Sequence, residues 1–203
     1  MTETDLRRQR MPRNERRTQL LDFALEVFVE QGYHAASMDE IALRAGVSKP
    51  VLYQHFPGKL DLYIALIESS ADEVIQQIRE ALQSTEDNKE RVSAVIRVFF
   101  DYVSNSAAAF RLIYESDLTN DPIVAREVKR VTTEIGESIA NVIRHDTDLP
   151  DPAAHLLAVG LVGAGLTSAQ YWLANDSELS KEQAVSLIGT LAWRGIGGFP
   201  LND

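Results

Sequence analysis

The sequence predicts an all-α protein of about nine helices, with a small N-terminal three-helix domain followed by a larger helical domain. Helix-capping residues recur along the chain, each followed by apolar positions at helical spacing. No segment has the pattern expected of a β-strand. The first domain is expected over residues 1–58 and the second over 59–203, because Pro57-Gly58 interrupts the helical pattern.

The first helix is expected over residues 13–31, with Gly32 as its stop signal. Ser37 and Glu40 then have the spacing of a capping box. In this arrangement the serine hydroxyl accepts a bond from the amide three residues on, and the glutamate reaches back to the serine amide. A second helix should therefore start at Met38.

A tight turn should join the second helix to a third. Gly46 provides the positive φ that ends a helix, and Ser48 is placed to cap the next one. Pro50 is tolerated in a first turn, where its missing amide hydrogen has no helical partner. Val51 and Leu52 would anchor this helix, leaving its polar side chains exposed. The layout is that of a helix-turn-helix, whose second helix enters the DNA major groove.

Six further helices are expected in the second domain. They cover residues 59–84, from 87 to beyond 103, 107–115, 121–145, 151–174 and 180–195. Asp121-Pro122 and Asp151-Pro152 each place a capping carboxylate before a first-turn proline. Ser180 and Gln183 form a second capping-box pattern.

The net charge of −10 seems unsuited to DNA binding, but its distribution resolves this. Residues 1–62 hold nine Lys/Arg and nine Asp/Glu, so the whole excess of acid lies in residues 63–203. Arginines cluster before and within the first helix. Of these, Arg13, Arg16 and Arg17 are the candidate phosphate contacts.

From Arg13 to Glu68 the sequence resembles the N-terminal domain of TetR-family transcriptional regulators. The resemblance rests on the first helix and on the segment MDEIALRAGVSKPVLYQHFPGKLDLY. Within it lie a Gly-Val-Ser turn, a Tyr, a His-Phe pair and a Lys three residues beyond the Phe. Gly58 departs from the family pattern, in which a polar cap is more usual, but glycine is an acceptable N-cap.

The resemblance implies a double-stranded DNA operator as partner and assigns contacts by position. Base-edge or groove contacts are implied for Met38, Lys49, Pro50, Val51 and Gln54, and phosphate contacts for Tyr53, His55 and Lys59. The side-chain chemistry agrees with these roles. Lysine donates to guanine, glutamine pairs with adenine, and valine fits a thymine methyl group. The alternatives are core packing for Tyr53 and a capping or packing role for His55.

The run from Ala153 to Ala174 contains no Asp, Glu, Lys or Arg and is long enough to cross a bilayer. Polar residues within it and ordinary caps at both ends favour burial in protein instead, so no membrane partner is expected. One side would face the ligand domain and the other a second copy. The last helix is also apolar, and the resemblance implies a homodimer through these two helices.

The resemblance also implies a small-molecule effector held in the larger domain. Few charges fall among the candidate residues, which favours a hydrophobic ligand. The candidates, with a filled core as the alternative, are Phe99, Phe100, Val103, Phe110, Ile113, Tyr114, Val162, Leu166, Gln170 and Tyr171. Gly163 and Gly165 are expected to leave volume for a cavity.

Three segments, FRLIYESDLTNDP, AVGLVGAGLTSAQYWLA and AWRGIGGFPL, resemble actinobacterial regulators of fatty-acid synthesis that respond to long-chain acyl-CoA. Such a ligand would need cations at the mouth of its tunnel. The candidates are Arg97, Arg111, Lys129, Arg130 and Arg144. The alternative is a repressor of an efflux or catabolic operon that responds to another hydrophobic molecule. In either case the ligand would move the helix of residues 59–84 and change the spacing of two DNA-reading helices.

Other functional classes lack support in the sequence. No catalytic triad, phosphate-binding loop or zinc pattern is present, so an enzyme, a cofactor and a metal site are not expected. Asp151 and His155 lie one helical turn apart but are too few for a metal. A chain without cysteine or signal peptide fits the cytoplasm. A DNA-binding protein without a ligand, and a sensor that no longer binds DNA, are the remaining rivals.

Overall fold

The computed structural model describes residues 11–105, 118, 121–175 and 178–195. These residues form eight helices and no strand, which confirms the all-α class. The expected helix over 107–115, with Phe110, Arg111, Ile113 and Tyr114, lies outside them. The chain divides into two compact units, residues 1–66 and 67–203. The predicted boundary falls at the start of a helix, whereas the units divide within that helix.

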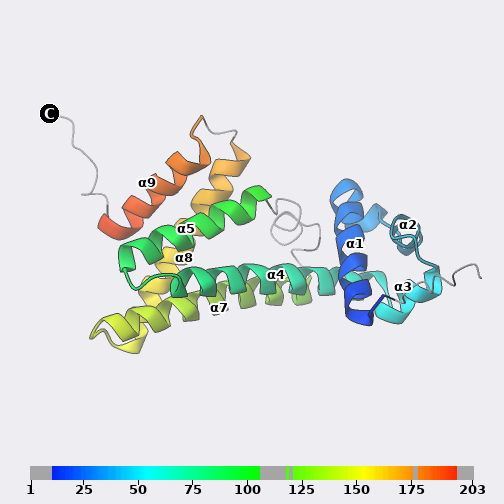
Figure 1. The fold of residues 1–203 in the computed structure, drawn as a ribbon, viewed down its shortest axis with the longest axis horizontal. Coiled ribbons are helices and arrows are strands. Elements are labelled where there is room, and N and C mark those ends of the chain that lie inside the picture. Colours follow the sequence, from blue (N-terminus) through cyan, green and yellow to red (C-terminus); the bar gives the residue numbers. More distant parts are fainter. Residues whose placement is uncertain (1–10, 106–117, 119–120, 176–177, 196–203) are drawn as a thin grey trace, which may run out of the picture. The chain divides into compact units, whose positions relative to one another are not determined.

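The first unit contains α1 (Arg13–Ala35), α2 (Met38–Arg44), α3 (Lys49–His55) and the start of α4 (Lys59–Gln83), as Figure 1 shows. The predicted stop at Gly32 is a kink with φ +77°, after which α1 makes one more turn. The core of this unit is apolar and closely packed. Its fully buried side chains include Leu20, Ile41, Leu52, Phe56, Leu62 and Tyr63.

The second unit contains the rest of α4, α5 (Asn88–Asn105), α7 (Pro122–Asp146), α8 (Asp151–Ala174) and α9 (Lys181–Arg194). The central helix is α8, which packs against α5, α7 and α9, while α5 also packs against α9 (Figure 1). Phe99 and Phe100 of α5 are fully buried in this core.

Two of the three predicted caps in this unit are confirmed. The Asp121 carboxylate accepts bonds from the amides of Ile123 and Val124, at 2.8 and 3.4 Å. Ser180 and Gln183 form the complete capping box. The cap predicted at Asp151 is wrong, because the N-cap residue is Pro150 and Asp151 is already helical. Its carboxylate instead accepts a bond from Arg144.

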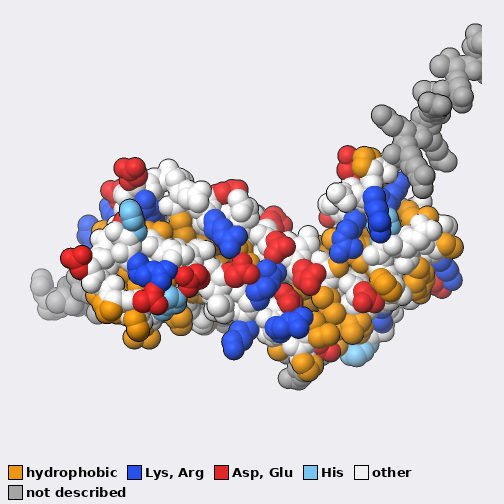
Figure 2. Space-filling model, turned by 90° about the horizontal axis from the view of Figure 1, so that it is seen from below, with side chains coloured by type: hydrophobic (Ala, Val, Ile, Leu, Met, Phe, Trp, Pro, Cys, Tyr) orange, Lys and Arg blue, Asp and Glu red, His pale blue; other side chains and the backbone are white. Residues whose placement is uncertain are grey.

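An ion-pair network joins α4 to α7 within this unit. Arg130 donates to Asp72 of α4 at 2.9 Å and to Glu127 at 2.8 Å, and Glu127 is the one buried charged residue in the described part of the chain. Arg79 of α4 pairs with Glu134 of α7 at 3.1 Å. Figure 2 shows basic and acidic side chains interspersed on the face that lies at the bottom of Figure 1. The network fixes the register of the two helices.

The glycines of α8 have two different surroundings. A methyl group at Gly165 would lie 2.6 Å from Cδ2 of Phe99, so this glycine allows α5 and α8 to pack closely. The prediction that Gly165 leaves space for a cavity is therefore wrong. Methyl groups at Gly160 or Gly163 would meet nothing within 4 Å, since both residues are exposed.

One face of α8 is exposed although its side chains are apolar. Leu156 is 74 % exposed, Val159 58 % and Tyr171 69 %. The helix is long and apolar enough to cross a bilayer, and 28 % of its most apolar stretch is buried within the protein. A single helix of this kind is weak support for a membrane span, because core helices share the same composition. The exposed apolar face of α8 is the more informative feature, because contiguous apolar surface often marks an interaction site.

Candidate nucleic-acid interface and effector cavity

The turn between α2 and α3 is held by backbone bonds that require glycine. Gly46 has φ +63°. Its amide donates to the Leu43 carbonyl at 3.1 Å, and the Val47 amide donates to the Ala42 carbonyl at 3.0 Å. These two bonds form a Schellman motif, which satisfies the last carbonyls of α2 and fixes the direction in which α3 leaves.

The cap of α2 forms only in part. The Ser37 hydroxyl accepts a bond from the Glu40 amide at 3.2 Å, as predicted. The Glu40 side chain accepts bonds from Gln31 and Arg44 instead of the Ser37 amide. The Ser48 side chain makes no capping bond to α3. The helix-turn-helix therefore relies on its turn and its core more than on side-chain caps.

The recognition surface of α3 consists of Lys49, Pro50, Tyr53 and Gln54. All four side chains are exposed, and Tyr53 is 46 % exposed, which argues against core packing for it. Leu52 on the opposite side is fully buried and anchors the helix. The structure thus presents most of the predicted base-contacting side chains on one accessible helix.

Lys49 and Arg44 differ in how readily each side chain could leave its present partners to contact DNA. Lys49 Nζ lies 2.5 Å from Asp39 Oδ2, with both side chains about 60 % exposed. A solvent-exposed ion pair contributes little to stability, so a DNA base can replace Asp39 as the partner of Lys49 at a small cost in free energy. Arg44 bonds to Glu30 and Glu40 and therefore ties α2 to α1.

The start of α1 brings its arginines close to the end of α3. Arg17 Nη1 lies 3.5 Å from the His55 carbonyl oxygen, and the Arg17 guanidinium lies 4.4 Å from the centre of the Phe56 ring. Burial, followed by the charges of Arg13, Arg17 and Arg16, lowers the pKa of His55 below its usual value. A neutral imidazole next to three cations is a suitable donor set for a phosphate group.

Two predicted contacts are less accessible than the others. Lys59 Nζ donates to the carbonyl oxygens of Tyr33, His34 and Ala36 at 2.8, 3.1 and 2.9 Å. All three of its hydrogens thus stabilise the end of α1, and a phosphate contact would have to replace one of these bonds. The Met38 side chain is 7 % exposed, which leaves little surface for a base.

The described members of the predicted effector set fall in two separate cavities or in neither. Phe99, Val162 and Leu166 line a void of about 10 Å³, large enough for a single water molecule at most. Phe100 and Tyr171 line a second hollow of about 370 Å³, which they share with residues of α9. Val103 and Gln170 line neither. Within residues 11–105, 121–175 and 178–195, no described cavity brings all of these side chains together, and Phe110, Ile113 and Tyr114 lie outside those residues.

A different cavity of about 370 Å³ is lined by residues of α4, α5, α7, α8 and α9. We call it the effector cavity. Its apolar lining residues are Leu82, Val92, Val95, Ile96, Ile139, Val142, Ile143, Leu149, Leu157, Leu161, Ala192 and Trp193. Its size is near the lower end of ligand pockets, which span about 300–1,000 Å³.

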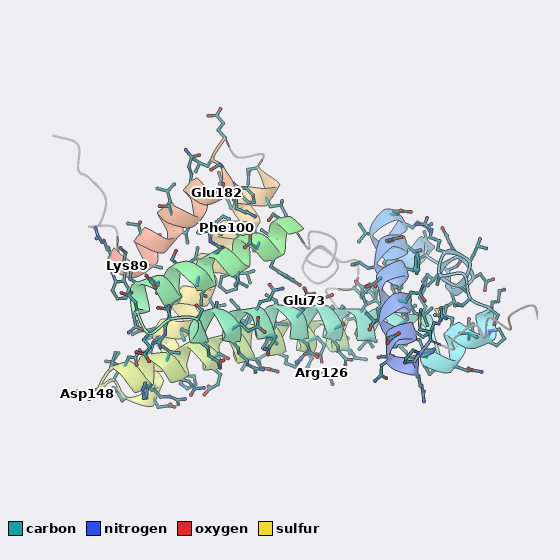
Figure 3. The ribbon with its side chains drawn as sticks, viewed as in Figure 1. Glu73, Lys89, Phe100, Arg126, Asp148 and Glu182 are labelled. Atoms are coloured by element: carbon teal, nitrogen blue, oxygen red, sulfur yellow. The ribbon has the colours of Figure 1, made fainter. Side chains whose placement is uncertain are left out.

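The polar residues of the effector cavity gather at one end. Asn88 and Arg91 come from the first turns of α5, and Asp146 and Thr147 from the end of α7. Figure 3 labels their neighbours Lys89 and Asp148 at the same end of this unit. Arg91 Nη1 lies 2.8 Å from Asp146 Oδ2 and donates to Asn88 Oδ1 at 2.9 Å.

Sequence reasoning missed this cavity because its lining comes from five helices far apart in the chain. None of the described cations predicted for a CoA group lines it. Arg130 and Arg144 are engaged in ion pairs, and Arg97 and Lys129 are exposed. The only signal for Arg91 was an arginine one turn after a helix start, which is too common to single out.

A cluster of titratable groups connects α7 to α8. His155 Nε2 lies 2.5 Å from Glu137 Oε2, and Nδ1 lies 3.0 Å from the Asp151 carbonyl oxygen. The bond to this carbonyl, followed by the bond to Glu137, raises the pKa of His155. Among the described residues, no three His, Asp or Glu side chains are placed to hold a metal ion.

Comparisons with known proteins agree with this architecture. Residues 20–66 match the family model described as bacterial regulatory proteins, tetR family, and residues 88–195 match the tetracyclin repressor-like C-terminal domain. The chain is 46 % identical over 192 residues to the HTH-type transcriptional activator FasR of Mycolicibacterium smegmatis, covering 95 % of this chain and 88 % of the relative.

Two solved structures have similar folds. A TetR-like transcriptional regulator from Rhodococcus sp. RHA1 has a TM-score of 0.71 and 28 % identity, covering 94 % of this chain and 100 % of that one. The regulator FadR from Bacillus subtilis, solved in complex with stearoyl-CoA, has a TM-score of 0.71 and 20 % identity, covering 88 % and 98 %. The second likeness concerns the fold alone.

Proposed function

The chain belongs to the TetR family of bacterial regulatory proteins, and on that basis we propose that it binds a palindromic operator as a homodimer under the control of an apolar effector. It is a DNA-binding transcriptional regulator and not an enzyme. The observation that best supports the proposal is the exposed recognition surface of α3 beside the arginines of α1.

In this proposal α3 enters the major groove. Lys49 donates to guanine and Gln54 pairs with adenine, while Val51 meets a thymine methyl group. Tyr53 and His55 each donate one bond to phosphate, supported by the three arginines of α1. Base contacts give specificity, and the arginines give affinity that depends on salt.

The exposed apolar face of α8 supports the homodimer. Leu187, Leu191 and Trp193 of α9 are also 37–46 % exposed, so both final helices present apolar side chains to solvent. A second copy related by two-fold symmetry would bury these surfaces against each other. Two recognition helices would then meet half-sites about 34–36 Å apart.

We place the effector in the second unit, where the effector cavity supplies an apolar wall with one polar end. A long-chain acyl-CoA is the preferred class, because FadR was solved with stearoyl-CoA and FasR is a relative over nearly the whole chain. The regulated genes would then be those of fatty-acid synthesis. The protein would act in the cytoplasm. The effector would shift α4 and change the separation of the two recognition helices.

Native mass measurement of the purified protein, alone and with DNA from upstream of its own gene, tests the DNA and dimer proposals. A dimer that binds one palindromic duplex is expected. A monomer in both conditions, or equal binding to unrelated duplexes, would contradict them.

Titration of palmitoyl-CoA into the operator complex at fixed salt tests the effector proposal. A hundredfold change in DNA affinity needs about 2.7 kcal/mol of differential binding. An unchanged operator affinity would rule out acyl-CoA as the effector while leaving DNA binding intact.

A further inference from the structure

One end of the effector cavity carries charged side chains, although the rest of its wall is apolar. From it we propose that Arg91 binds the anionic head group of a single-chain amphiphile, which displaces Asp146 from the guanidinium. The inference deepens the proposed function, since it rests on an effector that binds in this cavity.

The ion pair between Arg91 and Asp146 is sheltered from water. The two side chains are only 17 % and 21 % exposed, far less than in the pair between Lys49 and Asp39. A sheltered cation needs a compensating anion, because an unpaired one is costly. Asp146 supplies this anion in the structure and thus occupies the position that a ligand oxygen would take.

Other bonds hold the Arg91 side chain in place independently of Asp146. Nε donates to the Thr85 carbonyl at 2.8 Å, and Nη1 donates to Asn88 at 2.9 Å. Among the described residues, no acceptor bonds to Nη2. The guanidinium would therefore keep its position when Asp146 is displaced, with two nitrogens able to meet carboxylate or phosphate oxygens.

The wall of the cavity selects the other part of the ligand. Twelve of the sixteen lining residues are apolar, and the four polar ones lie together at the end that Arg91 occupies. An apolar chain with one anionic end matches this division. A neutral molecule would leave the ion pair unchanged and gain only from apolar burial. The ligand would also break the tie between the start of α5 and the end of α7.

The two tryptophans of the chain allow a direct test, because Trp193 lines the effector cavity and Trp172 lines the other hollow. A Trp172→Phe background leaves Trp193 as the reporter. Its fluorescence is titrated with dodecanoate, methyl dodecanoate and dodecanoyl-CoA. We expect the acid to bind at least about tenfold tighter than its methyl ester, the gain typical of a charged hydrogen bond.

Variants of the pair separate the head-group contact from the apolar wall. Arg91→Gln should remove the preference for acid over ester and leave ester binding unchanged. Asp146→Asn should strengthen acid binding about two- to tenfold, because the competing charge is gone while the fold keeps its shape. Arg79→Gln is the matched control, since this arginine pairs with Glu134 outside the cavity.

An acid-to-ester ratio that neither cavity variant changes would overturn the proposal. If Arg91→Gln weakens the binding of dodecanoyl-CoA alone, the head group that Arg91 binds is phosphate. If it weakens the binding of dodecanoate, the head group is carboxylate. Trp193 emission that changes with none of the three probes, at a protein concentration where the protein is dimeric, would overturn it too. Loss of operator control with intact Arg91-dependent binding would reject only the proposed function.

Discussion

Replacing Gly165 with alanine tests how closely α5 and α8 pack. The added methyl carbon would lie 2.6 Å from Cδ2 and 2.9 Å from Cε2 of Phe99, and 3.0 Å from Cδ1 of Ile96. Carbon atoms attract best at about 3.5–4.0 Å. The ring would have to retreat by about 1 Å, but the void beside it measures only about 10 Å³.

Overpacking of this kind typically costs about 1–3 kcal/mol. Gly136 of α7 is the matched control, because it is also helical and buried but a methyl group there would meet nothing within 4 Å. Alanine at Gly136 should gain about 0.5–1 kcal/mol from helix propensity alone. We expect Gly165→Ala to be less stable than Gly136→Ala by about 1–3 kcal/mol.

Urea denaturation followed by circular dichroism measures this difference, at one protein concentration so that any dimer contribution is equal in both variants. Thermal midpoints should differ by roughly 2–4 °C for each kcal/mol in a chain of this size. Equal stability of the two variants would refute the close contact between Gly165 and Phe99.

Four further substitutions give distinct outcomes. Lys59→Met should lower the free energy of unfolding by about 1.5–3 kcal/mol, because three hydrogen bonds to the end of α1 are lost. If Lys59 also contacts a phosphate, the slope of log operator affinity against log salt concentration should become shallower by about one. Gln54→Ala should relax specificity at one base pair by about 1–3 kcal/mol, whereas Tyr53→Phe should weaken all sequences equally, as competition binding to operator variants would show. His155→Gln should remove a pH dependence of stability: the folded pKa of His155 is raised, so its contribution is complete below the ordinary value near 6.5 and is lost as pH rises through the folded pKa. Melting curves of wild type and variant that stay parallel from pH 6 to 8 would argue against this role.

Local signals in the sequence were enough to predict most elements of the fold. Asp121-Pro122 and the Ser180 capping box start helices where expected, and Gly46 ends α2 with the predicted positive φ. These features depend on residues that are neighbours in the chain, so their physics is visible in the sequence.

The two capping predictions that were wrong failed because the carboxylates bind other side chains in the folded protein. Asp151 was expected to cap α8, but Arg144 is close enough to bind its carboxylate. Glu40 was expected to complete a capping box, but Gln31 and Arg44 compete for it. Charge-assisted hydrogen bonds are strong, and these carboxylates bind partners four to nine residues away that are not part of the capping pattern.

The recognition surface could be predicted from the sequence, whereas the effector cavity could not. The recognition surface lies on a single helix of seven residues, so periodicity alone identifies its exposed side chains. The effector cavity combines residues from five helices, and its charged end joins Arg91 to Asp146 across 55 positions. Such pairings are set by tertiary packing, which one sequence does not specify.

The distance between the two recognition helices in the dimer tests the central claim most directly. A chain without native cysteine takes one spin label cleanly, for example at Glu26→Cys on the exposed side of α1. Pulsed electron resonance then gives the label-to-label distance with operator, alone, and with palmitoyl-CoA. We expect palmitoyl-CoA to move the distribution by several ångströms away from that of the operator complex. An identical distribution with palmitoyl-CoA bound would contradict control through the spacing of the two helices.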